Sequence, residues 1–447
     1  MKKHKYYLLV SVLFFFINQT FAQNPIITDQ YTADPSARIF NGKVYLYPSH
    51  DIRAKEGQGR PGWFCMEDYH VFSSENLTDW TDHGVIVSQN KVEWVDSTKY
   101  GLWAPDCIGK NGKYYFYFPA PAKDTIYGKG FSVGVAVSDS PSGPFIPESK
   151  PINKVHGIDP CPFIDKDGQA YLYWSARNIY VARLKDNMTE LASEPQIIDN
   201  LPEEGLKEGP FVFERDGIYY LTYPHVQNKT ECLEYALGNS PMGPFKAEGV
   251  IMDESSSGCW TNQQSFIYYK NQWYLFYHDN DLSPEFDKNR SVRIDSMFFN
   301  ADGTIRKVTP TLRGVGLTEA SKKIQIDRYS RICENGAIIA FLDTLSRFEG
   351  WKTILNDKNA WIQYNGVNFV KKSYRTINIR AQSETGGTIQ LRINGSDGPV
   401  ITLVKIPEGV EWKTIQVPAP RIKPGVYDVV VSLVEDKPVA VDWLKYE

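Results

Sequence analysis

Past its first 22 residues, the sequence has no apolar run long enough to cross a bilayer. A membrane-spanning helix needs about 20 consecutive apolar residues, so we expect no membrane insertion. Basic residues are not in excess either, because 49 Lys and Arg stand against 53 Asp and Glu. This balance argues against nucleic acid and anionic membrane surfaces as partners. A long amphipathic helical pattern is also missing, and the sequence therefore predicts an all-β protein.

Cysteine occurs six times, but the spacing of the residues matches no metal-binding pattern. A chain of 447 residues can bury a sizeable core without disulfide bonds. We therefore expect free, buried cysteines, and the sequence identifies no metal site. The six residues are Cys65, Cys107, Cys161, Cys232, Cys259 and Cys333.

The first 22 residues have the pattern of a secretory signal peptide. Lys2, Lys3 and Lys5 form a basic start, a short apolar run follows from Leu8, and Ala22 offers a small residue at the cleavage position. No cysteine follows the apolar run, so a lipid anchor is not expected. The sequence thus predicts export to the periplasm or the extracellular space.

One phrase, a turn of the Asn-Gly or Asp-Gly type followed by an alternating aromatic strand, recurs five times. Both central residues of a type I′ hairpin turn have positive φ, which Asn, Asp and Gly tolerate. A repeat with a period of about 50 residues indicates a radial array of small sheets. We therefore expect residues 23–316 to form a five-bladed β-propeller with four strands in each blade. The copies are NGKVYLY from Asn41, NGKYYFY from Asn111, DGQAYLY from Asp167, DGIYYLT from Asp216 and NQWYLFY from Asn271.

An acidic residue precedes four of these turns by five to eight positions, namely Asp34, Asp106, Asp159 and Glu208. The innermost strand of every propeller blade lines the central channel, so these carboxyl groups should converge on one axis. Facing carboxylates repel and push their pKa values apart, which suits acid/base chemistry. Asp106, within WAPD, fits a turn-capping role equally well.

The repeated pattern ends near residue 316, and the sequence predicts a second, all-β domain over residues 317–447. Short alternating strands are separated by Gly, Pro, Asn and Asp turns, which predicts a β-sandwich of the jelly-roll kind. The expected strands are Trp361 to Phe369, Thr376 to Arg380, Thr388 to Ile393, Trp412 to Val417, Val426 to Val434 and Ala440 to Tyr446.

The acidic residues belong to an ordered set of motifs that resembles glycoside hydrolase family 43. The motifs are ADPS at Ala33, WAPD at Trp103, GIDP at Gly157, EGP at Glu208 and FYH at Phe276. The resemblance implies a five-bladed propeller that hydrolyses glycosides with inversion at the anomeric carbon. It also implies Asp34 as the general base, Asp159 as a residue that tunes pKa, and Glu208 as the general acid.

Four further residues are candidates for substrate binding. Trp103 and Trp260 each precede a turn copy, and either could stack on a sugar or fill a blade core. For His278 the resemblance implies an axial residue that holds a water or a cation, and a buried His bonded to a carbonyl is the alternative. Arg290 is similar in placement to a family Arg that reaches the acid and the substrate, and a solvated surface Arg is the alternative. We expect that no cofactor is required, and the sequence leaves open whether a structural calcium ion binds.

A long, polar, Gly-rich insertion spans Ser49 to Tyr69 and contains Trp63 and Phe64. Long insertions in compact domains are usually functional or mobile. This insertion could close one end of the pocket, which would favour the release of terminal sugars.

The C-terminal domain resembles carbohydrate-binding module family 6 through WIQYNGVNF, EWKTIQV and AVDWLKYE. The resemblance places sugar-stacking aromatics near Trp351 and Trp412. That family usually has an Asn two residues before the Asp of the last motif, whereas this chain has Ala440. A domain that only rigidifies the propeller is therefore the alternative to a sugar-binding module.

Together these observations predict a secreted, inverting, exo-acting glycosidase that removes arabinofuranose or xylose from plant oligo- or polysaccharides, and we expect a monomer. A β-galactosidase of the same family is one alternative. A carbohydrate-binding propeller without turnover is another, although a lectin has no need of three carboxylates. A retaining sialidase or fructosidase propeller is disfavoured, because its acidic motifs differ.

Overall fold

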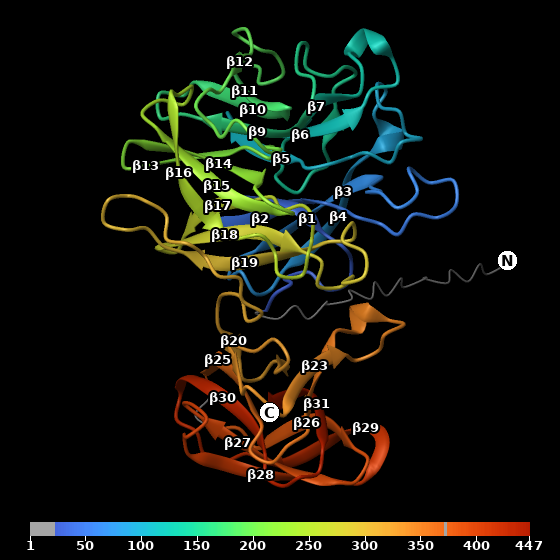
Figure 1. Ribbon diagram of the computed structural model, residues 1–447, viewed down its shortest axis with the longest axis vertical. Helices are drawn as coiled ribbons and strands as arrows, with labels where there is room; N and C mark the ends of the chain where they lie inside the picture. The colour runs from blue at the N-terminus through green and yellow to red at the C-terminus, as the bar shows by residue number, and fades with distance from the viewer. Residues whose placement is uncertain (1–22, 371–372) are drawn as a thin grey trace, which may run out of the picture.

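The computed structural model describes residues 23–370 and 373–447, so the predicted signal peptide lies outside the described residues. Figure 1 shows two β-rich domains, one running from β1 (Ala33–Phe40) to β19 (Ser291–Met297) and the other from β20 (Thr318–Glu319) to β31 (Val439–Tyr446). The helices of the described part are three short 3₁₀ turns, η1 (Gln89–Lys91), η2 (Thr125–Tyr127) and η3 (Arg347–Glu349). The predicted all-β class is confirmed.

Five antiparallel sheets form the larger domain, and each carries one copy of the repeated turn between its first two strands. The prediction of five propeller blades is therefore confirmed. Blade one contains β1, β2 (Lys43–Ser49), β3 (Asp68–Ser74) and β4 (Thr81–Ser88); blade two contains β5 (Asp106–Lys110), β6 (Lys113–Pro121), β7 (Phe131–Ser138) and β8 (Ile146–Pro147); blade three contains β9 (Ile158–Ile164), β10 (Ala170–Ala176), β11 (Asn178–Arg183) and β12 (Gln196–Ile197); blade four contains β13 (Phe211–Arg215), β14 (Ile218–Val226), β15 (Glu231–Gly238) and β16 (Phe245–Met252); blade five contains β17 (Ser265–Tyr269), β18 (Gln272–Asp279) and β19.

The repeated turns have the backbone that their residues predict, with one exception. In four of the five copies both central residues have positive φ, as with Asn41 (52°) and Gly42 (76°). The third copy is longer, because the Asp165 amide donates to the Gln169 carbonyl over 2.9 Å and only Gly168 takes positive φ. A two-residue turn is therefore wrong for this copy, where a glycine-containing three-residue loop joins the strands.

The fifth blade differs from the expected four strands, because its sheet has only three. Residues 26–32 run along β19 and complete the ring. The amides of Ile26 and Thr32 donate to the carbonyls of Val292 and Arg290 over 2.9 and 3.0 Å. The chain leaves this segment directly into β1, so the first and last blades are joined by backbone hydrogen bonds, and the opening of β1 is fixed against blade five.

The smaller domain contains two six-stranded sheets. The six expected strands all exist, but the sequence analysis missed the other six strands of these two sheets. One sheet contains β20, β22 (Arg331–Ile332), β25 (Trp361–Phe369), β27 (Gly387–Ile393), β28 (Val400–Ile406) and β30 (Gly425–Leu433); the other contains β21 (Ile324–Gln325), β23 (Ala337–Phe341), β24 (Trp351–Leu355), β26 (Thr376–Ser383), β29 (Gly409–Pro418) and β31. Fully buried aliphatic side chains such as Ile379, Leu391 and Val431 fill its core, and the predicted β-sandwich is confirmed.

The two domains share a small apolar cluster that includes Tyr31 and Leu282 from the propeller and Trp351 from the sandwich. The Arg328 guanidinium lies 3.8 Å from the centre of the Trp351 ring. Trp351 is therefore buried in the domain interface and cannot stack on a sugar there, contrary to what the family resemblance implies.

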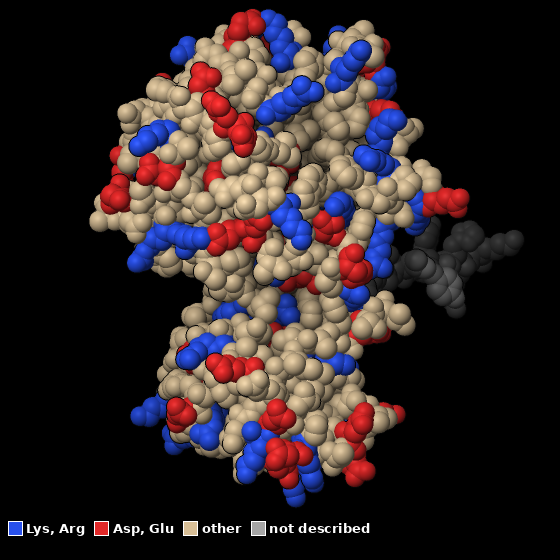
Figure 2. Space-filling model, in the orientation of Figure 1, with Lys and Arg blue, Asp and Glu red and all other residues tan. Residues whose placement is uncertain are grey.

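Charged side chains of both signs are interspersed over the visible face of both domains, and Figure 2 shows no continuous basic stripe there. The described residues contain no helix that is long and apolar enough to span a membrane. All six cysteines are free, and five of them are buried, as the sequence predicts.

Candidate active site

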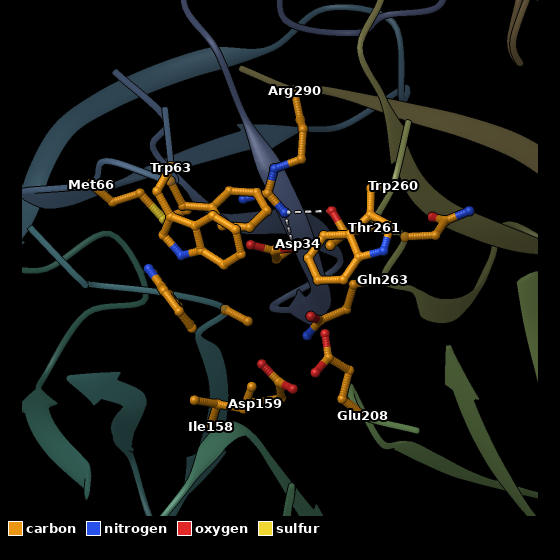
Figure 3. Close-up of a pocket in the computed structure, with 14 residues that line it drawn as sticks. Asp34, Trp63, Met66, Ile158, Asp159, Glu208, Trp260, Thr261, Gln263 and Arg290 are labelled. Carbon is orange, nitrogen blue, oxygen red and sulfur yellow. Dashed lines mark hydrogen bonds and ion pairs between the residues drawn. The ribbon is translucent and has the colours of Figure 1, made fainter. Parts of the chain in front are cut away.

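A cavity of about 520 Å³ lies where the inner ends of the blades converge. Figure 3 shows the carboxyl groups of Asp34, Asp159 and Glu208 directed into it, each from a different blade. Trp103, Trp260 and Arg290, which the sequence analysis also singled out, line the same cavity, and His278 does not.

Irregular backbone presents these carboxyl groups to the cavity. Asp34 and Asp159 both have positive φ (46° and 56°), and the pairing of β1 and of β9 shifts register beside each one. Bulges of this kind re-aim a side chain and cluster near active sites. Next to Glu208, Gly209 has φ 54°, and a Cβ there would lie 2.9 Å from Pro224. The strained positions therefore coincide with the candidate catalytic groups.

Asp34 accepts hydrogen bonds on both carboxylate oxygens. Arg290 Nη1 donates to Oδ1 over 2.7 Å, and Ser49 Oγ donates to Oδ2 over 2.7 Å. Two donors with no competing acceptor suit an ionised carboxylate. Asp34 thus has the chemistry of a group that can accept a proton from water.

Arg290 is held in place by Asp51, a residue that the sequence analysis missed. Its Nε and Nη2 donate to the two Asp51 oxygens, each over 2.9 Å, and its backbone amide donates to Oδ2 over 2.8 Å. Burial alone would lower the pKa of Arg290, but the charges of Asp34 and Asp51 raise it above its ordinary value. Arg290 is only 2% exposed, so the alternative of a solvated surface arginine is wrong.

Asp159 and Glu208 point toward each other on the other side of the cavity (Figure 3). Asp159 Oδ2 accepts from the Gly209 amide over 3.0 Å. Burial raises the pKa of Asp159 well above its ordinary value, and the charge of Glu208 raises it further. Burial likewise raises the pKa of Glu208, and the charge of Asp34 adds to that rise. The pair is therefore built to retain a proton, in contrast to Asp34.

A fourth carboxyl group, Glu231, interacts with Glu208 and was not found from the sequence. It is 1% exposed, and its Oε2 accepts from the Asn262 amide over 2.6 Å. Burial, and then the charge of Glu208, raise the pKa of Glu231 well above its ordinary value. Two carboxyl groups can share a hydrogen bond only if one carries a proton. This contact raises the pKa of Glu231 and lowers that of Glu208, so a proton shared by the two groups resides on Glu231.

His278 lies behind Asp34 and does not face the cavity. Its Nδ1 accepts from the Asp34 amide over 3.1 Å, and its Nε2 lies 3.0 Å from the Thr261 carbonyl. Burial, followed by the charge of Arg290, lowers the pKa of His278 to about 3. The ring is neutral, and both nitrogens are used to position the backbone at Asp34. This matches the alternative of a buried, carbonyl-bonded histidine.

An aromatic wall closes one side of the cavity above Asp34. Trp63 and Phe64 come from the long insertion, and their rings lie 6.2 and 6.5 Å from that of Trp260. Phe64 also lies 6.0 Å from Trp103. The insertion thus walls off one side of the pocket, as expected, and supplies apolar faces of the kind that sugars stack on.

Asp106 opens blade two as the other acids open theirs, yet it does not line the cavity. Arg38 Nε donates to it over 2.9 Å, and Arg38 Nη2 and Ser36 Oγ contact it closely. Asp106 is therefore the buried partner of an arginine between blades. Its role is structural, although it is an ion pair and not the turn cap that the sequence analysis considered.

The residues present do not fit a calcium ion on the axis. Calcium takes six to eight oxygen ligands, whereas both nitrogens of the axial His278 are already occupied by protein groups. Elsewhere in the described part, His50, Asp68 and His70 could hold an ion, with one ligand atom from each lying within 4.8 Å of the others. Two imidazoles and one carboxylate do not suit calcium either.

A five-bladed propeller whose axial cavity combines an arginine-held carboxylate with buried carboxyl groups of raised pKa has the groups that a glycosidase needs. Residues 22–305 match the family model of the glycosyl hydrolases family 43, and the chain belongs to this family. Residues 344–447 match the carbohydrate-binding module of family 6. Both resemblances seen in the sequence are therefore confirmed.

Relatives of known name agree with this assignment. A xylosidase/arabinosidase 43A from Humicola insolens is 37% identical over 63% of this chain and 98% of the relative. A solved β-xylosidase/α-arabinofuranosidase from a compost metagenome, in complex with xylotriose and in a calcium-free form, is 35% identical, with a TM-score of 0.58 over 65% of this chain and 98% of that one. An arabinoxylan arabinofuranohydrolase from Bacillus subtilis shares the fold over 96% of this chain and 99% of its own, with a TM-score of 0.55 and 23% identity.

Proposed function

We propose that this glycosidase is exo-acting and inverting, and that it releases arabinofuranose or xylose from plant oligo- or polysaccharides. The observation that carries the proposal is the contrast inside one cavity. Asp34 accepts two hydrogen bonds as an ionised group does, while burial raises the pKa of Glu208. Inverting hydrolysis requires one ionised carboxylate as the base and one protonated carboxyl group as the acid.

In the proposed reaction, Asp34 takes a proton from a water molecule whose oxygen attacks the anomeric carbon. The glycosidic bond breaks, and Glu208 gives its proton to the leaving oxygen. Repulsion within the Asp159 and Glu208 pair opposes ionisation of both groups at once. Asp159 also accepts from the Gly209 amide, which fixes the peptide next to the acid. No step requires a cofactor, and a structural calcium ion takes no part.

Exo action and the choice of sugar rest on the shape of the cavity and on the relatives. The aromatic wall of Trp63, Phe64 and Trp260 leaves a small pocket that suits a single terminal sugar. The relatives named above carry xylosidase and arabinosidase activities in their names. We further propose that residues 1–22 direct export, and that the monomer is active, since one chain supplies the whole cavity.

Proton NMR of the first-formed product tests the stereochemistry. In inverting glycosidases the two carboxyl groups stand roughly 6.5–9.5 Å apart so that water fits between the base and the sugar. The fresh sugar should therefore have the opposite anomeric configuration to the substrate. A retained anomer or a trapped glycosyl-enzyme would overturn the inverting mechanism.

A panel of aryl glycosides tests the sugar. We expect the highest kcat/KM on α-L-arabinofuranosides or β-D-xylosides. Turnover confined to galactosides would replace the substrate class without affecting the roles of the carboxyl groups.

A further inference from the structure

A second cavity, of about 800 Å³, adjoins the catalytic cavity at Glu208. It shares Ile158 and Glu208 with the catalytic cavity. The two cavities also meet at an aromatic pair, because Phe131 of the second lies 4.4 Å from Trp103 of the first. A general acid protonates the leaving oxygen, so the departing part of the substrate must lie on the side of Glu208. The second cavity is in that position.

The second cavity is lined by cations that lack carboxylate partners. Lys129, Arg177 and Lys207 all line it, and Glu208 is its single acidic residue. None of the three cations forms an ion pair within 4.0 Å with a carboxylate of residues 23–370 or 373–447. Because Glu208 holds a proton when it acts as an acid, the cavity has a net positive charge in the reactive state.

Lys207 is the most unusual of the three, since it is only 8% exposed. Its ammonium donates to the carbonyls of Glu204 and Gly205 over 3.0 and 2.9 Å, and the nearby Glu234 carboxylate is taken by His225 over 2.9 Å. A buried cation without a counter-ion is costly and is usually retained for function. It also stands directly before Glu208 in the chain, so its place in the wall is fixed.

Arg177 supports the same interpretation. It has φ 66° in the tight connection between β10 and β11, a left-handed conformation that non-glycine residues adopt rarely. The side chain is exposed and lines the cavity. A backbone held in this conformation beside an active site is a common sign of a functional constraint.

We propose that this second cavity is a leaving-group subsite that selects a sugar chain bearing a carboxylate, such as a uronic acid substituent. The proposal rests on the proposed function, since it assigns the part of the same substrate that departs. Lys129 and Arg177 attract the carboxylate at the rim, and Lys207 provides a fixed positive charge in the wall. A neutral chain still enters but gains no ion pair.

The test compares two matched substrates: neutral xylotriose, and a xylotriose that carries a methylglucuronic acid on the sugar next to the cleaved bond. We expect kcat/KM to be roughly fivefold to tenfold higher for the acidic substrate at low ionic strength, since exposed ion pairs contribute modestly. The preference should shrink as salt is added, because salt screens exposed charges.

Variants assign the preference to the cavity. Arg177→Gln and Lys129→Gln should each lower the ratio of the two kcat/KM values, and Arg177→Glu should lower it most. Arg183→Gln is the matched control, because Arg183 is an exposed cation on β11 that does not line the cavity. A ratio of one or less in the wild-type protein, or a ratio unchanged in all three cavity variants, would overturn the subsite.

Calorimetric titration of Asp34→Ala with the same two oligosaccharides separates this proposal from the proposed function. Tighter binding of the acidic ligand, reduced by Arg177→Gln, supports the subsite even if the wild-type protein hydrolyses neither substrate. Equal binding overturns the subsite and leaves the glycosidase assignment intact.

Discussion

The propeller axis and the core of the sandwich are buried to a similar degree but contain different types of side chain. The sandwich core consists of fully buried aliphatic side chains such as Leu391, Val431 and Leu444. The propeller axis instead buries Asp34, Asp159, and other charged groups at 6% exposure or less. The aliphatic core of the sandwich favours stability. The propeller axis instead contains buried charged groups that depend on one another for hydrogen bonds and ion pairs.

The same contrast appears in the backbone. In the sandwich, the non-glycine residues with positive φ among the described ones are Asn359 and Asn394, and asparagine tolerates this region well. On the axis the corresponding residues are Asp34 and Asp159. These two carboxyl groups thus lie where the backbone adopts an unfavourable conformation, as expected of functional sites.

The largest effect should follow from removing either member of the base and acid pair. Asp34→Ala and Glu208→Gln should each lower kcat by about 10²–10⁴-fold or more, because each removes a proton-transfer group. Folding should change little, since Arg290 keeps its two bonds to Asp51 when Asp34 is lost. Turnover of an aryl glycoside, with circular dichroism as the folding control, measures both. Near-normal turnover in either variant would remove the proposed mechanism.

Asp106→Ala should have the opposite effect: it should lower the free energy of unfolding and leave kcat nearly unchanged. It leaves the Arg38 guanidinium buried between blades without its carboxylate. Breaking a buried ion pair costs about 3–5 kcal/mol. Urea unfolding should show this loss, while the folded fraction keeps its kcat. A large fall in kcat at unchanged stability would move Asp106 into the catalytic set.

Deletion of residues 317–447 sharpens the comparison between the domains. It exposes Tyr31 and Leu282 and breaks the ion pair of Arg347 with Glu285. We expect the Tm of the propeller to fall by about 5 °C or more, roughly 2 kcal/mol for a domain of this size. Activity on polymer and on aryl glycosides should fall alike. Ala440, which cannot hydrogen-bond a sugar, favours this structural outcome.

A single substitution checks the opposite possibility for the sandwich. Trp412 lies on β29 and is half-buried, with the Arg380 guanidinium 5.2 Å from its ring. If the domain binds polysaccharide there, Trp412→Ala should lower activity on polymer only, with an unchanged Tm. Affinity electrophoresis of the full chain on xylan and arabinan would show that loss directly.

Much of the fold could be predicted from the sequence because it depends on residues that are close together in the chain. The Asn-Gly turns and the alternating strands that follow them depend on neighbouring residues, so five copies gave five blades. The missing fourth strand of blade five depends instead on contacts between residues about 270 positions apart, such as Ile26 with Val292. The sandwich strands β23 and β28 were missed because both are partly exposed and lack a clear buried face.

At the site, the acids with a turn downstream were found, and the groups that support them were not. Asp51 lies within a polar insertion, and Glu231 opens β15, the third strand of blade four, where no acidic motif marks it. Both act through contacts across the axis, with Arg290 and Glu208 respectively. A sequence shows which residue types recur, but it does not show which charges end up facing each other.

The smallest effect should be a shift in the pH profile of Asp159→Asn. The last proton shared by the Asp159 and Glu208 pair is held by burial and by repulsion between the two carboxyl groups, both of which raise the pKa of Asp159. A neutral amide removes the repulsion, so Glu208 loses its proton at a lower pH. The basic limb of kcat/KM should therefore move to lower pH by about one unit.

The acidic limb should move less, because the hydrogen bonds of the base Asp34 to Arg290 and Ser49 are unchanged in this variant. Asp165→Asn is the matched control, since this acid lies just past the end of β9 and accepts the Tyr219 hydroxyl outside the cavity. Its pH profile should match that of the wild-type protein. A basic limb that stays in place in Asp159→Asn would assign the raised pKa of Glu208 to burial and the charge of Asp34, and would end the tuning role of Asp159.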